Sequence, residues 1–285
     1  MVIQSLARFD VETWKVYKFV RRIRPCWENI VTMNAAVPNA QERRSKFFFY
    51  AGIGCVLTAF LGFTPTYFSP LVSGSFTAHP IIHLHGILFF SWTLFFTFQA
   101  WLIASGRTMR HRDVGLLGIS MATAMFFLGL MASVDVARRA AAAGFAADGN
   151  RFMVVPVAAI VMFALLVALA IVYVKNKDVH KRLMFIATAS ILDAAIARLF
   201  ITFLAPPPVP GSSPVPPLFV TIPPSLLADL FIISGMVFDW RSRGRIHPVY
   251  FIAGGAVLAV HVLRVPFAAT EAWNSIAQWL LHVAG

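Results

Sequence analysis

Seven apolar stretches, each long enough to cross a lipid bilayer, limit the fold of this chain more than any other feature. A transmembrane helix needs about 20 predominantly apolar residues to span roughly 30 Å of hydrocarbon. Because backbone polar groups inside a bilayer must be bonded within the protein, such stretches predict helices. The expected fold is therefore an all-α bundle of seven transmembrane helices. The stretches are residues 47–69, 81–104, 114–136, 152–174, 183–204, 219–239 and 249–268.

The composition agrees with a membrane-embedded chain and excludes two other classes of protein. Hydrophobic residues make up 59% of the sequence and charged residues only 13%, whereas soluble domains contain about 25% charged residues. Disordered chains are polar and highly charged, so disorder is excluded as well. The net charge of +12 would suggest nucleic-acid binding in a soluble protein, but here the basic residues lie in loops between apolar stretches. We therefore expect the lipid bilayer, and no nucleic acid, as the partner.

The distribution of Lys and Arg predicts the orientation of the bundle. Of the 24 Lys and Arg residues, 19 lie in segments that alternate along the chain, namely 1–46, 105–113, 175–182 and 240–248. Of the intervening loops and the C-terminal tail, only the loop 137–151 carries basic residues, and it has three. Since loops rich in Lys and Arg stay in the cytoplasm, we expect the N-terminus inside and the C-terminus outside.

Three parts are expected along the chain: a basic N-terminal segment (1–46), the membrane domain (47–268) and an external C-terminal tail (269–285). Within residues 10–24, apolar side chains share one helical face and the basic ones lie mostly away from it. This pattern predicts an amphipathic helix on the cytoplasmic leaflet, bound to anionic lipids. A surface helix docked on the protein's own loops fits the pattern equally well.

Five ionisable residues lie well inside the last three apolar stretches, where each is costly unless it is paired or faces a wet cavity. Asp193 and Arg198 lie in the fifth stretch, Asp229 in the sixth, and His261 and Arg264 in the seventh. A rise of about 1.5 Å per residue places all five between the midplane and the outer third of the membrane. The opposite charges could pair, either only to fix the helix register or to form a functional site.

A second group of candidate residues lies in HPIIHLHG, at the entrance of the second stretch. It carries His79, His83 and His85, and Pro80 suits the first turn of a helix with His79 at its cap. Imidazole binds zinc, copper and iron, and Asp135 could add a carboxylate ligand or orient a histidine. These three histidines and Asp135 are candidate metal ligands, although histidines also gather at wet helix ends without any ligand.

The first of three functional hypotheses is a membrane redox protein that binds haem b or a transition metal (Zn, Cu or Fe). A membrane haem b needs imidazoles from two helices and cations near its propionates. His83 or His85 would oppose His261 as ligands. Arg198 and Arg264 would balance the propionate or ligand charge.

The other two hypotheses use the same residues differently. In a proton-coupled transporter, Asp193 and Asp229 would carry protons beside the two membrane arginines. In a metal-dependent membrane hydrolase, the three histidines and Asp135 would hold a metal-bound water. An assembly role, in which the ion pairs only fix packing, is the remaining interpretation. Whether the chain is an enzyme stays open.

Several short motifs carry a resemblance to a known group of proteins. They are GFTPTY (62–67), HLHG (83–86), a GR pair and an HR pair (106–107 and 111–112) and HKRLMF (180–185). Together they resemble a family of uncharacterised bacterial polytopic integral-membrane proteins, over roughly residues 47–200. The resemblance implies a multi-pass protein of the bacterial inner membrane and assigns no catalytic roles.

Overall fold

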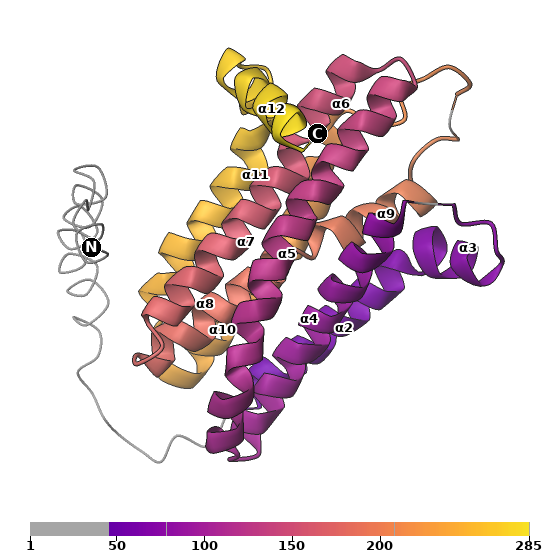
Figure 1. Ribbon diagram of the computed structural model, residues 1–285. Helices are drawn as coiled ribbons and strands as arrows, with labels where there is room; N and C mark the ends of the chain where they lie inside the picture. The colour runs from indigo at the N-terminus through magenta and orange to yellow at the C-terminus, as the bar shows by residue number, and fades with distance from the viewer. Residues whose placement is uncertain (1–45, 78, 208, 285) are drawn as a thin grey trace, which may run out of the picture. The chain divides into compact units, whose positions relative to one another are not determined.

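Seven helical spans make up most of the part of the chain that the computed structural model describes, residues 46–77, 79–207 and 209–284. All seven are long and apolar enough to cross a membrane, and each coincides with one of the predicted stretches. The expected bundle of seven transmembrane helices is thus confirmed (Figure 1). The amphipathic helix predicted at 10–24 lies outside the described residues.

Five of the spans consist of more than one helical segment. The first begins as α2 and continues through a π-helical turn, η1, into α3, while a short turn divides the fifth into α8 and α9. The segments are α2 (Phe47–Phe63), η1 (Thr64–Phe68), α3 (Ser69–Val72), α4 (Pro80–Ala104), α5 (Thr108–Ala142), α6 (Ala146–Phe152), α7 (Val154–Val172), α8 (Lys177–Ser190), α9 (Asp193–Phe203), η2 (Leu218–Thr221), α10 (Ile222–Arg243), η3 (Tyr250–Gly254), α11 (Gly255–Phe267) and α12 (Glu271–Val283).

The packing of these helices places the fifth span at the centre of the contacts. Helix α8 packs against α7 and α10, and α9 packs against α2 and α10. Helix α4 packs mainly against α2 and α5, whereas α11 packs mainly against α10 and α7. The candidate residues of the fifth, sixth and seventh stretches are therefore on neighbouring helices.

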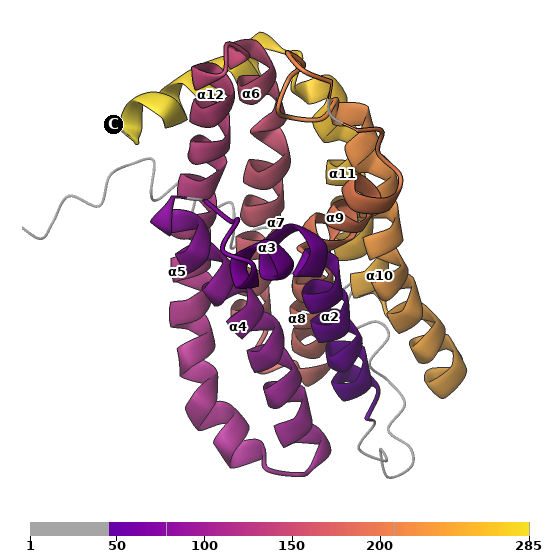
Figure 2. The same ribbon diagram turned by 90° about the vertical axis from the view of Figure 1, so that its right-hand side faces the viewer.

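The C-terminal segment, predicted as an external tail, forms a packed helix. Thr270 caps α12 by accepting a hydrogen bond from the backbone N–H of Trp273 at 3.2 Å. Trp273 and Ala277 are buried against residues of α5 and of the α6–α7 segment, and the Trp273 indole donates to the carbonyl of Asn150 at 2.9 Å. Figure 2 shows α12 lying beside α6 at one end of the bundle. An apolar face at helical spacing explains why this short segment folds.

Close backbone contact fixes α2 against α9. A Cβ atom added at Gly62 would overlap the backbone carbonyl group of Ala195. Small residues at helix crossings allow such close approach inside membranes, where packing drives association. This close contact fixes the position of the α9 backbone relative to α2 at Ala195.

We predict that Gly62→Ala destabilises the protein, because the added methyl group forces the two backbones apart. Overpacking of this kind costs about 1–3 kcal/mol. Gly115→Ala is the matched control, since that helical glycine has open space where the methyl group would be. Thermal unfolding in detergent should show a lower midpoint for Gly62→Ala only. Equal midpoints for both variants would contradict the inferred crossing.

Candidate functional site

The first polar cluster inside the bundle is an ion pair between Asp193 and Arg264. Asp193 opens α9, and its Oδ2 lies 3.2 Å from Nη1 of Arg264 on α11. Ser225 on α10 donates to the same oxygen at 3.1 Å, and Nη2 of Arg264 donates to Ser225 Oγ at 2.7 Å and to the Thr221 carbonyl at 3.3 Å. All of these side chains are buried. Both charges are therefore compensated by several partners from three helices.

The second cluster is a buried carboxylate–histidine pair one helical turn away. Asp229 follows Ser225 by four residues on α10, and His261 precedes Arg264 by three on α11, so both pairs lie along the same interface. His261 Nδ1 is 3.1 Å from Asp229 Oδ2. The other carboxylate oxygen, Oδ1, is buried and has no hydrogen-bond partner among the described residues. Asp229 is thus less well compensated than Asp193.

Arg198 lies apart from both clusters. It follows Asp193 by five residues, roughly 140° around the helix, and so faces a different direction. Its guanidinium carbon lies 5.5 Å from the centre of the Phe63 ring of α2. Within the described ranges no carboxylate pairs with it. The prediction that both membrane arginines join one charge cluster therefore holds for Arg264 and not for Arg198.

The three histidines of HPIIHLHG have different neighbours and do not face a common point. His79 is the exposed N-cap of α4, as Pro80 predicted. His83 Nδ1 lies 3.0 Å from the hydroxyl of Tyr67. His85 is stacked on Phe89, with ring centres 4.1 Å apart, and its buried Nδ1 has no hydrogen-bond partner within residues 46–77, 79–207 and 209–284.

The predicted metal ligands are not gathered at one point. Asp135 forms an ion pair with Arg139 on its own helix at 2.8 Å. Across the described part of the chain, no three His, Cys, Asp or Glu side chains lie close enough together to hold a metal ion. The physical reason lies in the helix, where His83 and His85 project roughly 200° apart. His83 and His85 lie on α4, whereas His261 lies on α11. Helix α4 packs mainly against α2 and α5, and α11 packs mainly against α10 and α7.

A buried charge network that the sequence analysis missed joins α8 to α10. Arg182 Nε and Nη2 donate to the two oxygens of Asp239 at 2.7 and 2.5 Å, and both side chains are almost fully buried. Nη1 of Arg182 donates to Asp178 Oδ1 at 2.9 Å. The sequence analysis used Arg182 only as one of the basic loop residues that predict the orientation of the bundle. The signal that could have revealed the pair is an acid, Asp239, at the same end of the following span.

His247 completes this network at the turn before η3. Its backbone N–H donates to Asp239 Oδ2 at 3.2 Å, and its Nδ1 accepts from the N–H of Val249 at 3.2 Å. Burial, assisted by the nearby Arg182 cation, lowers the pKa of His247 to about 4. The imidazole is therefore neutral at pH 7 and serves as an acceptor.

The two other motif histidines, His111 and His180, lie next to each other at the same end of the bundle. Their ring centres are 6.4 Å apart, and His180 Nδ1 donates to the carbonyl of Ala170 at 2.8 Å. Gln99 on α4 lies against His111; with its amide turned so that the nitrogen donates, it reaches His111 Nδ1 at 2.6 Å. Gln99 therefore positions His111, beyond the packing role expected for it.

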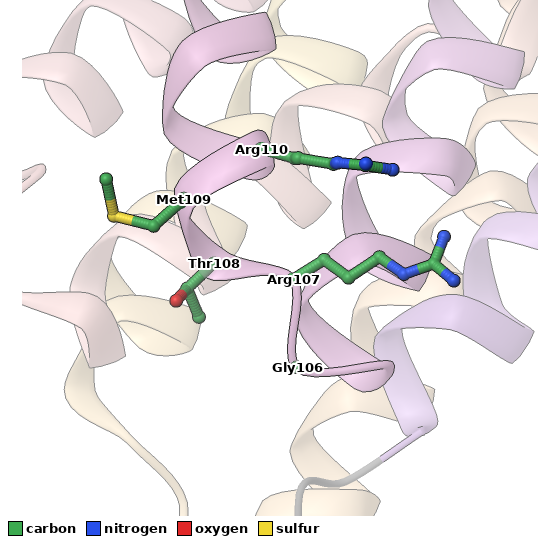
Figure 3. Close-up of a pocket in the computed structure, with 5 residues that line it drawn as sticks. All are labelled: Gly106, Arg107, Thr108, Met109 and Arg110. Carbon is green, nitrogen blue, oxygen red and sulfur yellow. The ribbon is translucent and has the colours of Figure 1, made fainter.

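A surface hollow of about 380 Å³ lies at the turn between α4 and α5. It is lined by the residues of the turn itself, and Figure 3 shows the Arg107 and Arg110 side chains extending to the same side while Met109 points away. Arg107 also lies 4.6 Å from the centre of the Trp101 ring. The hollow contains none of the buried acids or histidines, so the candidate site is the pair of clusters between α9, α10 and α11.

Comparisons with protein-family models, with curated proteins and with solved structures found no match. The resemblance based on the short motifs therefore stays a prediction.

We predict that Asp239→Asn strongly destabilises the fold, because it leaves the buried Arg182 without its counter-ion. Removing one partner of a buried pair costs about 3–5 kcal/mol. Arg139→Gln, which breaks the exposed pair with Asp135, is the control and should cost about 0–1 kcal/mol. Unfolding in detergent measures both, and similar losses would argue against a structural role for the buried pair.

Proposed function

We propose that this chain is a proton-coupled transporter in which the Asp229–His261 pair takes up and releases the coupled proton. The observation that carries the proposal is the buried Oδ1 atom of Asp229, which has no hydrogen-bond partner among the described residues. A carboxylate oxygen without a hydrogen-bond partner has free lone pairs at which a proton can bind. The adjacent imidazole can accept or return that proton, because its two ring nitrogens can act as donor and acceptor.

The neighbouring Asp193–Arg264 pair has a different role in this proposal. Asp193 is held by an arginine and a serine hydroxyl, so protonating it would disrupt a bonded cluster. Among the residues that the structure describes, the Asp229 carboxylate has a single side-chain partner, His261. A proton can therefore bind Asp229 at lower cost, while the fixed pair keeps α9, α10 and α11 in register. This narrows the sequence-based hypothesis, which gave both acids the same role.

Irregular helices beside the clusters support the same proposal. The fifth span is interrupted immediately before Asp193, and α10 has Pro223 and Pro224 in its first turn. Transporter sites are commonly formed where spans are broken, because the freed backbone groups line the site. The basic loops favour an N-terminus on the inside, which places Asp229 in the outer half of the membrane. The motif resemblance favours a bacterial inner-membrane setting.

The proposal predicts that Asp229→Asn abolishes proton movement coupled to a solute. The full-length protein would be placed in liposomes that contain a pH-sensitive dye, and a panel of small organic solutes would be added outside. We expect one class of solute to carry protons inward with the unsubstituted protein. Asp229→Asn should show none of this movement, because an amide cannot exchange the proton.

Asp113→Asn is the matched control, since Asp113 is an exposed acid in a different helix. It should keep the coupled proton movement, and thermal unfolding should confirm that both variants fold. Full proton coupling in a folded Asp229→Asn variant would contradict the proposed role of the pair.

A membrane redox protein is the second candidate, and one observation favours it. Nδ1 of His261 and of His83 each lie within hydrogen-bond distance of a side-chain oxygen, Asp229 Oδ2 and the Tyr67 hydroxyl. Such partners orient an imidazole so that Nε2 can bind a metal or haem iron. The hydrolase hypothesis has no comparable support, because its four ligands are dispersed.

A reduced-minus-oxidised visible spectrum of the purified protein separates the two candidates. The transporter proposal predicts a featureless spectrum. Sharp alpha and beta bands that disappear in His261→Ala would identify haem b and favour the redox function.

A further inference from the structure

Backbone hydrogen bonds fix the shape of the turn between α4 and α5. Gly106 has a φ of 80°, in the left-handed region that glycine adopts without strain. Its N–H donates to the carbonyl of Ile103 at 3.0 Å, and the N–H of Arg107 donates to the carbonyl of Leu102 at 2.7 Å. This pair of bonds is a common C-terminal cap of a helix that ends at glycine. Arg107 is also the N-cap of α5, so the ends of two helices hold its backbone.

Arg107 continues a row of side chains that runs along α4. Its guanidinium carbon lies 4.6 Å from the centre of the Trp101 ring, and Trp101 is stacked on Phe98 with ring centres 5.8 Å apart. Phe98 is exposed, and so is Leu94 one turn earlier. Large apolar side chains exposed on a membrane helix face lipid, and Trp is typical of the membrane–water interface. The row therefore runs from the hydrocarbon at Leu94 to the level of the lipid headgroups at Arg107.

Arg110 has the corresponding place on α5. It lies in the first turn of that helix, and Figure 3 shows its side chain extending to the same side as Arg107. Leu117 is exposed and follows Arg110 by seven residues, so the two share one helical face. Neither arginine forms an ion pair with an acid in the part of the chain that the structure describes. Two uncompensated positive charges thus lie beside each other, each at the end of a lipid-facing row.

The surface hollow of about 380 Å³ joins the two arginines, since both line it. Ligand pockets commonly measure about 300–1,000 Å³, so this one suits a small group such as a lipid headgroup. A guanidinium that is stacked on an aromatic ring keeps its N–H donors free, because they lie in the plane of the group. Arg107 and Arg110 can therefore both donate hydrogen bonds to one oxyanion.

We infer that Arg107 and Arg110 bind the phosphate of an anionic phospholipid at the α4–α5 turn. Phosphate matches the fork of donors on arginine, and the lipid-facing rows of α4 and α5 accommodate the acyl chains. The turn belongs to the basic loops that we expect in the cytoplasm, where the anionic lipids of the membrane attract basic residues. This site does not depend on the proposed function, since it contains neither Asp229 nor His261.

The fluorescence of Trp101 can test this inference, because the indole lies beside the site. The full-length protein would be placed in phosphatidylcholine nanodiscs with a small fraction of phosphatidylglycerol that is brominated near the headgroup, where bromine quenches a neighbouring indole. Brominated phosphatidylcholine at the same fraction is the reference lipid, and Trp101→Phe identifies the signal of Trp101. We expect phosphatidylglycerol to quench Trp101 more strongly than phosphatidylcholine. Equal quenching by the two lipids would overturn the inference.

Arg107→Gln and Arg110→Gln should each lower the preference for phosphatidylglycerol about fivefold, the attraction of one basic residue to an anionic membrane surface. Arg112→Gln is the matched control, because it removes the same charge from an exposed position of α5 outside the hollow. It should keep the preference. All three side chains are exposed, so the variants should fold, and thermal unfolding checks this. An unchanged preference in the first two variants, or an equal loss in all three, would contradict the site.

Inorganic phosphate presents the same chemical group without acyl chains, and a competition measurement separates the two sources. Phosphate would replace chloride in the buffer at constant ionic strength. The preference of Trp101 for phosphatidylglycerol should not change, because contacts with the acyl chains also hold the lipid. Loss of the preference in phosphate would assign the hollow to a soluble phosphate compound and overturn the inference.

Discussion

A charge buried in a transmembrane bundle must find a partner, and this requirement organises the structure. Water cannot solvate such a group, so an unpaired ion inside the protein costs far more than one at the surface. Arg182 with Asp239, and Arg264 with Asp193, meet the requirement through bonds between helices. One pair ties α8 to α10 and the other ties α9 to α11, at two different levels of the bundle.

The group that departs from this requirement is the one to which we assign function. Asp229 is bonded through one carboxylate oxygen, and its other oxygen, Oδ1, is buried without a hydrogen-bond partner among the described residues. Asp229 is therefore the acid that we propose binds the proton.

The sequence predicted the seven spans because hydropathy and length alone identify a membrane helix. It also predicted that the acids of the fifth and sixth spans could pair with the cations of the seventh, since all lie at similar depth. It could not assign the partners, because the choice between Asp193 and Asp229 for Arg264 depends on helix rotation. Arg182 was assigned to a loop because basic residues at span ends usually serve topology. His83 and His85 were grouped because they are close in sequence, whereas helical geometry separates them.

The central claim is that Asp229 binds a proton reversibly within the membrane bundle. The most direct measurement is an infrared titration of the full-length protein in lipid, with the Asp229→Asn variant as the reference. The account predicts a protonated carboxylic-acid band that appears and disappears as the pH is changed and is missing from the variant. A spectrum in which no such band depends on Asp229 at any pH where the protein is folded would contradict it.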